Sequence, residues 1–135
     1  APKVSKVIYI NMAWDPVRRE FMEHQLRNLS HAWKDDVDLT WERLEGIDKK
    51  HLQSDEAFTS WRKKGFSQAP FPKVDNDWGV AGCAASHYSA IEKIPDSSAK
   101  EADEDDLVMI IEDDVELKLS FPKMWEELWR WMPDE

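Results

Sequence analysis

The sequence has one cysteine, few glycines and no long hydrophobic run. Cys83 is the only cysteine among 135 residues, so it cannot form an internal disulfide or build a cysteine-rich metal site. No apolar run approaches the roughly 20 residues that cross a bilayer, and no signal peptide opens the chain, so we expect no transmembrane segment. The length allows a single domain, and an apolar share of 41% excludes a disordered acidic tail.

Basic residues are scarce in the last third of the chain. Residues 96–135 hold 14 acidic and 4 basic side chains, which account for the whole net charge of -10. Such a segment repels polyphosphate backbones, so nucleic acid is not an expected partner, whereas divalent cations are natural counter-ions. Residues 96–106 are predicted to form an acidic, solvated connector within the domain.

Three short segments have the composition of strands, and helical patterns lie between them. Residues 7–10 are apolar without alternation, which is typical of a strand buried on both faces of a parallel sheet. Residues 107–111 form the clearest predicted strand, which is expected to be buried. Residues 39–47 contain a further predicted strand. Strands separated by helices predict an α/β fold with a mostly parallel sheet flanked by helices. The predicted helices begin at Pro16, near Ser54, at Gly79 and near Pro122.

The expected ends and apolar faces of these helices follow from the same patterns. Gly65 ends the helix that begins near Ser54, residues 66–77 form a loop, and Pro95 ends the helix over 79–94. Apolar residues at helical spacing, expected to pack inward, are Val17, Phe21, Leu26 and Leu29 in the first helix and Met124, Trp125, Leu128 and Trp129 in the last.

Ligands of open α/β sheets bind beyond the carboxyl ends of the strands, which selects the loops after Ile10 and Ile111. The second loop holds Glu112, Asp113 and Asp114, three carboxylates that repel one another. A divalent cation offsets this repulsion, and carboxylates with diphosphate oxygens suit Mg²⁺ or Mn²⁺. Alternation predicts that Glu112 and Asp114 point together and Asp113 away. The alternative is a solvated acidic loop.

The first loop and the helix after it offer groups that bind anions. Asn11 directly follows the strand that leads into this loop, and Arg18 and Arg19 lie near the start of the helix after it. Arginine makes bidentate phosphate contacts, and a strand-to-helix loop is a natural anion site. The alternative is that the arginines are solvated surface residues.

A cluster of small residues precedes His87. Gly79 and Gly82 allow close approach of a ligand or of a neighbouring element, and His87 is either a phosphate donor, a base or a structural residue. Cys83 is expected to be small, buried and without a lowered thiol pKa. Two further sets leave alternatives open. Asp48 either reaches a ribose or base or caps a turn. Trp14 and Trp78 either stack on a ligand or pack in the core.

Four segments in order, covering most of the chain, resemble glycosyltransferase family 25, which includes lipooligosaccharide and procollagen galactosyltransferases. Residues 8–12 with 16–20 resemble the strand, the Ile-Asn-Leu and the Arg-Arg helix of the family, and residues 41–48 its Arg-x-x-Ala-Val-Asp stretch. Residues 79–87 match Gly-x-x-Gly-Cys-x-x-Ser-His, and residues 111–115 resemble the Glu-Asp-Asp motif. Departures from the family pattern are Ala13, Trp14, Lys49 and Val80.

The resemblance implies a GT-A-like fold and inverting transfer of a sugar, usually galactose, from a UDP donor to a glycan, lipooligosaccharide or protein hydroxyl. It implies Mn²⁺ or Mg²⁺ as cofactor, held by Asp114 with Glu112 and Asp113, which also handle the donor. It places the remaining donor-binding residues at Asn11, Arg18, Arg19, Asp48, Gly82, Ser86 and His87.

The resemblance names no catalytic base, and His87 is the one candidate that the sequence offers. Residues 1–135 are expected to form one domain that holds the donor-binding portion, with the acceptor half and the usual inverting base beyond Glu135. Two alternatives are a nucleotide-sugar binder without turnover and an acidic domain that binds Ca²⁺ or a basic partner through residues 96–116. Relatives are cytoplasmic or membrane-associated in bacteria and lie in the endoplasmic reticulum lumen in animals, so the compartment stays open.

Overall fold

A computed structural model describes residues 1–52, 56, 78–97 and 106–133 and contains a three-stranded sheet of order β2-β1-β3. The strands are β1 (Val4–Asn11), β2 (Thr40–Glu45) and β3 (Leu107–Glu112), and β1 pairs in parallel with both neighbours. Ile10 lies beside Leu44 on one side and Glu112 on the other, so the three strands end level with one another. These strands confirm the predicted α/β fold with a parallel sheet.

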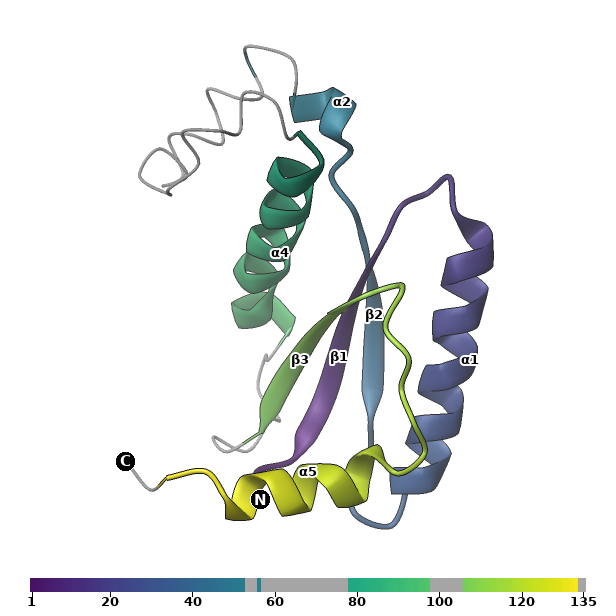
Figure 1. Cartoon of the computed structure of the whole chain (residues 1–135), viewed down its shortest axis with the longest axis vertical. Helices are drawn as coiled ribbons and strands as arrows, with labels where there is room; N and C mark the ends of the chain where they lie inside the picture. Colours follow the sequence, from purple (N-terminus) through teal and green to yellow (C-terminus); the bar gives the residue numbers. More distant parts are fainter. Residues whose placement is uncertain (53–55, 57–77, 98–105, 134–135) are drawn as a thin grey trace.

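Helices cover both faces of the sheet, with α1 (Pro16–Trp33) and α4 (Trp78–Ser97) on opposite sides in Figure 1. Alternate residues of β1 face the two layers. Val7 and Tyr9 pack with Leu26 and other residues of α1, whereas Ile8 and Ile10 belong to the cluster that includes residues of α4. Val7, Ile8 and Tyr9 are fully buried, as expected for a central strand that lacks polar alternation.

The first helix begins where its capping residues predict. The Asp15 side chain accepts a hydrogen bond from the Arg18 amide at 3.0 Å, and Pro16 occupies the first turn. Leu26 and Leu29 are buried as predicted. Val17 and Phe21 are 75% and 48% exposed, so the prediction for these two residues was wrong, because the face of α1 that packs on the sheet is the one that carries Met22, Leu26 and Leu29.

Two expectations for the end of the chain were wrong. Within the described residues β3 is an edge strand, so Leu107 is exposed and only Ile111 in this strand is buried. Helix α5 (Phe121–Arg130) lies across the end of the sheet, where Phe121 and Trp125 pack toward the core. Met124, Leu128 and Trp129 are exposed, because α5 contacts the core along a narrow strip.

The remaining differences concern helix ends and the chain outside the described residues. α4 continues two residues past Pro95, because proline removes one backbone donor without blocking the helical conformation of the residues after it. The predicted Gly65 helix end, the 66–77 loop and most of the acidic connector lie outside the described residues. A short helix, α2 (Lys49–Leu52), follows β2. None of the described helices is long and apolar enough to cross a membrane.

Candidate functional site

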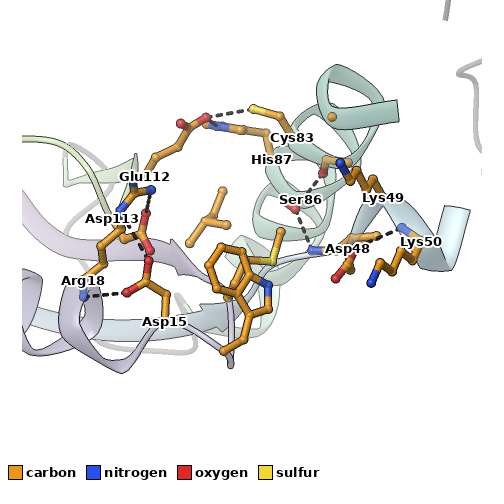
Figure 2. A pocket seen from close by; sticks show the side chains of 16 residues that line it. Asp15, Arg18, Asp48, Lys49, Lys50, Cys83, Ser86, His87, Glu112 and Asp113 are labelled. Carbon is orange, nitrogen blue, oxygen red and sulfur yellow. Dashed lines mark hydrogen bonds and ion pairs between the residues drawn. The ribbon is translucent and has the colours of Figure 1, made fainter. Parts of the chain in front are cut away.

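A pocket of about 670 Å³ lies at the carboxyl ends of the three strands. Its walls come from the loop after β1, the start of α1, the β2–α2 loop, α4 and the end of β3. This is the position that strand order predicts for a ligand site, and the volume is typical of small-molecule pockets. Figure 2 shows the acidic residues at the end of β3 and just before α1, together with Arg18, at one end and the lysines of α2 at the other.

Asn11 lies beneath the pocket and joins four elements. Its side-chain amide donates to Asp113 Oδ2 at 2.7 Å and to the Asp15 carbonyl at 3.0 Å, while its Oδ1 accepts from Arg43 Nε at 2.9 Å. The residue is 2% exposed and does not line the pocket. The side-chain polar groups of Asn11 therefore have protein partners, and its amide holds Asp113 in position.

Asp113 and Arg18 form the pocket wall on the α1 side. Arg18 Nη1 lies 3.7 Å from Asp113 Oδ1, and its Nε lies 3.4 Å from Asp15 Oδ2. The Arg18 side chain is 55% exposed, so an anion can reach its guanidinium from the pocket, whereas Asp113 is buried. The carboxylates of Asp15 and Asp113 thus orient the Arg18 guanidinium at the rim of the pocket.

Glu112 forms the wall on the α4 side, where it accepts two hydrogen bonds at one oxygen (Figure 2). Cys83 Sγ donates to Glu112 Oε1 at 2.8 Å, and His87 Nε2 lies 3.0 Å from the same atom. Cys83 and His87 are four residues apart on α4, one helical turn, so both face the end of β3. Cys83 is exposed rather than buried, which corrects the prediction for that residue.

These contacts shift the pKa values of two groups in opposite directions. The hydrogen bonds from Cys83 and His87 lower the pKa of Glu112, because they stabilise the carboxylate. The hydrogen bond to Glu112, together with partial burial and the charges of Glu112 and Asp114, raises the pKa of Cys83 to about 11. The thiol is therefore protonated at neutral pH. This agrees with the sequence, which predicts no lowering of the Cys83 pKa.

Ser86 and Gly82 hold the β2–α2 loop against α4. The buried Ser86 hydroxyl accepts from the Ile47 amide at 2.8 Å and donates to the Gly82 carbonyl at 2.7 Å. A Cβ on Gly82 would lie 2.8 Å from the Ile47 carbonyl oxygen, so only glycine permits this approach. Both residues line the pocket, but their polar groups and close contacts serve loop packing.

Three charged residues follow this loop. Asp48 Oδ1 accepts from the Lys50 amide at 2.9 Å, so the structure supports the turn-capping interpretation of Asp48. Lys49 and Lys50 are exposed and line the pocket, and Figure 2 shows them opposite the acidic end. Neither lysine was among the residues predicted for the site, although Lys49 departs from the family pattern.

Trp14 lines the pocket and is 70% exposed, so the packing alternative is wrong for this residue. Its exposed indole offers a flat apolar surface at the entrance. Met12 and Ile10 line the same pocket and add further apolar surface. The side chain of Trp78 lies outside the described residues.

The structure brings most predicted site residues together. Lining the pocket are Arg18, Asp48, Gly82, Ser86, His87, Glu112 and Asp113. Arg19 does not line the pocket, because it lies beside Tyr9. Burial and Glu23 raise the pKa of Tyr9 to about 12, and Arg19 opposes this shift. Asp114 is exposed and outside the lining, whereas Asp113, expected to point away, faces the pocket with Glu112. Alternation fails here because β3 ends at Glu112 and the chain turns.

The sequence matches one family model over residues 4–132, the model of glycosyltransferase family 25 (LPS biosynthesis protein). This match covers nearly the whole chain, so the fold is that of a glycosyltransferase. The protein is a member of glycosyltransferase family 25. No curated protein and no solved structure matched the chain.

Proposed function

We propose that the pocket binds a UDP-sugar, with galactose as the sugar, and that the sugar is transferred with inversion to a hydroxyl group of a glycan or protein in a metal-dependent reaction. Family membership supports sugar transfer in general. The donor assignment depends on one observation: carboxylates at the end of β3 and cations from α1 and α2 face one pocket at the carboxyl ends of the strands.

The distribution of charge in this pocket suits a diphosphate with a cation. Lys49 and Lys50 at one end and Arg18 at the rim offer positive charge to phosphate oxygens. The acidic end, with Glu112 and Asp113, would repel a bare diphosphate. A divalent cation between these carboxylates and the diphosphate removes this repulsion. Trp14 offers an exposed face on which a uracil ring can stack.

The carboxylates of residues 112–114 fit a hard divalent cation in donor chemistry. Glu112 and Asp113 already have protein partners, whereas Asp114 is exposed and has no hydrogen bond or ion pair within the described residues. We therefore propose Asp114 as the principal ligand of Mn²⁺. Because Asp114 lies outside the pocket lining, this places the ion at the outer rim of the acidic end, with Glu112 and Asp113 supporting it from the pocket side. The ion would neutralise charge on the leaving diphosphate.

A base must deprotonate the acceptor hydroxyl in this reaction. Among the described pocket residues, His87 is the imidazole, and Glu112 orients it at 3.0 Å. Its Nε2 is engaged with Glu112, so proton transfer to His87 requires the imidazole to use its other nitrogen or to exchange partners. We assign His87 as the candidate base.

Measurement of UDP binding together with donor turnover tests the proposal. We expect UDP to bind in Mn²⁺ and to lose its affinity in chelator, and Asp114→Ala to abolish the metal-dependent part. Glu116→Ala is the matched control, because Glu116 is exposed two residues further on and does not line the pocket. UDP binding that ignores both metal and Asp114→Ala would contradict the metal assignment. Metal-dependent binding without release of sugar from UDP-galactose in the presence of acceptors would instead support a nucleotide-sugar binder.

A further inference from the structure

Cys83, His87 and Glu112 place three different metal-binding atoms together. Their ligand atoms all lie within 4.8 Å of one another. No other group of three or more such ligands is found in the part of the chain that the structure describes. Two of them come from successive turns of α4 and the third from the end of β3, so two separate elements fix their positions. All three side chains line the pocket and are partly exposed, which leaves a path for an ion to enter.

The hydrogen bonds in this cluster converge on one atom. Glu112 Oε1 lies 2.8 Å from Cys83 Sγ and 3.0 Å from His87 Nε2. In a tetrahedral zinc site with ordinary bond lengths, neighbouring ligand atoms lie about 3.3–3.6 Å apart. The two separations from Glu112 are shorter than this range, and the Cys83 Sγ–His87 Nε2 separation is at most 4.8 Å, so side-chain rotations must bring all three separations into the range when the ion binds. One divalent ion can then replace the protons that Cys83 and His87 direct at the glutamate.

We propose that Cys83, His87 and Glu112 form a site for a borderline-soft divalent cation, Zn²⁺ or its analogue Co²⁺, with the fourth position open to the pocket. A thiolate and an imidazole favour these ions over Mn²⁺ and Mg²⁺, which prefer oxygen ligands. Three protein ligands with one open position is the arrangement of zinc sites that bind water or a ligand. When the ion binds, the thiol proton is released to solvent, and the imidazole binds through deprotonated Nε2 while Nδ1 carries the ring proton.

This site differs from the hard-cation site of the proposed function. The latter uses Asp114 as its principal ligand, whereas Asp114 is not a member of the present cluster. The proposal does not depend on a nucleotide donor, because it concerns binding of the ion to the protein alone. The two sites share Glu112 as a ligand, so an ion at one site competes with an ion at the other, and separate titrations of Co²⁺ and Mn²⁺ into Cys83→Ser and Asp114→Asn distinguish them.

Titration of Co²⁺ into the whole chain without nucleotide tests the proposal spectroscopically. We expect a thiolate-to-cobalt charge-transfer band that saturates at one ion per chain and disappears when Zn²⁺ is added in equal amount. Cys83→Ser should remove the band, and Cys83→Ser and His87→Gln should each weaken Zn²⁺ binding about 100-fold or more, because each removes a direct ligand. Asp114→Asn is the matched control and should change Zn²⁺ affinity less than about threefold, because one nearby charge is lost but no ligand.

Alkylation of Cys83 gives a second, independent measurement. Zn²⁺ should protect the thiol of the unmodified chain from iodoacetamide, and His87→Gln should abolish this protection at the same Zn²⁺ concentration. Far-UV circular dichroism of each variant separates loss of a ligand from loss of fold. Cobalt binding without the charge-transfer band, or Zn²⁺ affinity that is unchanged in Cys83→Ser, would overturn the proposal.

Discussion

Single side chains in this protein connect elements that are distant in sequence. Asn11 contacts Asp113, 102 residues further along, and Cys83 contacts Glu112 across 29 residues. These contacts orient the acidic end of the pocket before any ligand binds. Substitutions of such residues should therefore change measurable properties of their partners.

The reactivity of Cys83 tests its contact with Glu112. Because Glu112 raises the pKa of Cys83 to about 11, the wild-type thiol should react slowly with iodoacetamide at pH 8. Glu112→Gln removes the negative charge, returns the pKa toward its ordinary value of 9.0 and should accelerate alkylation by up to about 100-fold. Glu116→Gln, the control, should react like the wild type. Equal rates in Glu112→Gln and the wild type would contradict this contact.

The lowered pKa of Glu112 predicts a pH dependence of stability. A carboxyl whose folded pKa lies below its ordinary value of 4.5 stabilises the fold above that pH, and the contribution is lost as the pH falls through the folded pKa. The difference in unfolding free energy between wild type and Glu112→Gln should therefore shrink between pH 6 and pH 3. Urea unfolding at both values measures this difference, and a gap that widens on acidification would refute the assignment.

Ser86 supports the loop that carries the pocket lysines. Ser86→Ala leaves the Ile47 amide without its acceptor and should reduce the free energy of unfolding by about 2 kcal/mol. UDP affinity should also fall, because Lys49 and Lys50 follow this loop. Ser89→Ala on the same helix, outside the pocket lining, is the control. Calorimetric unfolding and UDP titration measure these two effects. A Ser86→Ala variant that keeps both the wild-type stability and the wild-type UDP affinity would exclude this role of Ser86.

Residue types and motif spacing predicted much of the site but not its orientation. Arg18, His87 and Glu112 were predicted from chemistry that suits phosphate or metal, and the structure places them in one pocket. The roles of Asn11 and Ser86 could not be predicted, because the partners of a buried amide or hydroxyl depend on tertiary contacts. The alternation rule failed at Asp113 because a strand end is also where the backbone turns.

At the scale of elements, the segment after β3 is held in place by α1. Gln25, which is buried in α1, donates from Nε2 to the Val115 carbonyl at 3.0 Å and accepts from the Leu117 amide at 2.6 Å. These two bonds imitate strand pairing and fix the chain just after Asp113. The orientation of the acidic loop therefore depends on a side chain about 90 positions earlier in the sequence.

Gln25→Leu tests this arrangement. The substitution keeps the apolar volume but leaves two backbone groups without partners, so we expect a loss of about 2 kcal/mol of unfolding free energy. Hydrogen exchange of the Leu117 amide should rise more than that of β1 amides. Asn28→Leu, at an exposed position three residues further along α1, is the control. Unchanged exchange at Leu117 in Gln25→Leu would show that the segment is fixed by other contacts.

Elements with strong local patterns were predictable and their surroundings were not. The apolar composition of β1 and the cap at Asp15 were sufficient to place a strand and a helix start. The exposure of Phe21 and Leu128 was not predictable, because periodicity defines an apolar face but not the element that covers it. Likewise, the composition of β3 could not indicate that it lies at the edge of the described sheet.

For the molecule as a whole, charge and topology lead to the same location. The acidic last third of the chain reaches the carboxyl end of the sheet through β3, where Arg18 of α1 pairs with Asp113, and the lysines of α2 lie at the opposite end of the pocket (Figure 2). Parallel strands that end level with one another make this convergence possible. The central claim is that a metal-bound nucleotide diphosphate binds at this location.

Calorimetric titration of UDP in the presence of Mn²⁺ into wild type, Arg18→Glu and Arg27→Glu tests that claim most directly. Both arginines are exposed on α1, but only Arg18 lines the pocket, so the variants share one charge change at different places. We predict that Arg18→Glu weakens UDP binding at least about tenfold, because it replaces a phosphate-binding cation with an anion, and that Arg27→Glu changes it less than about twofold. Equal affinity in the two variants, or no UDP binding to the wild type, would contradict the assignment of this pocket to the donor.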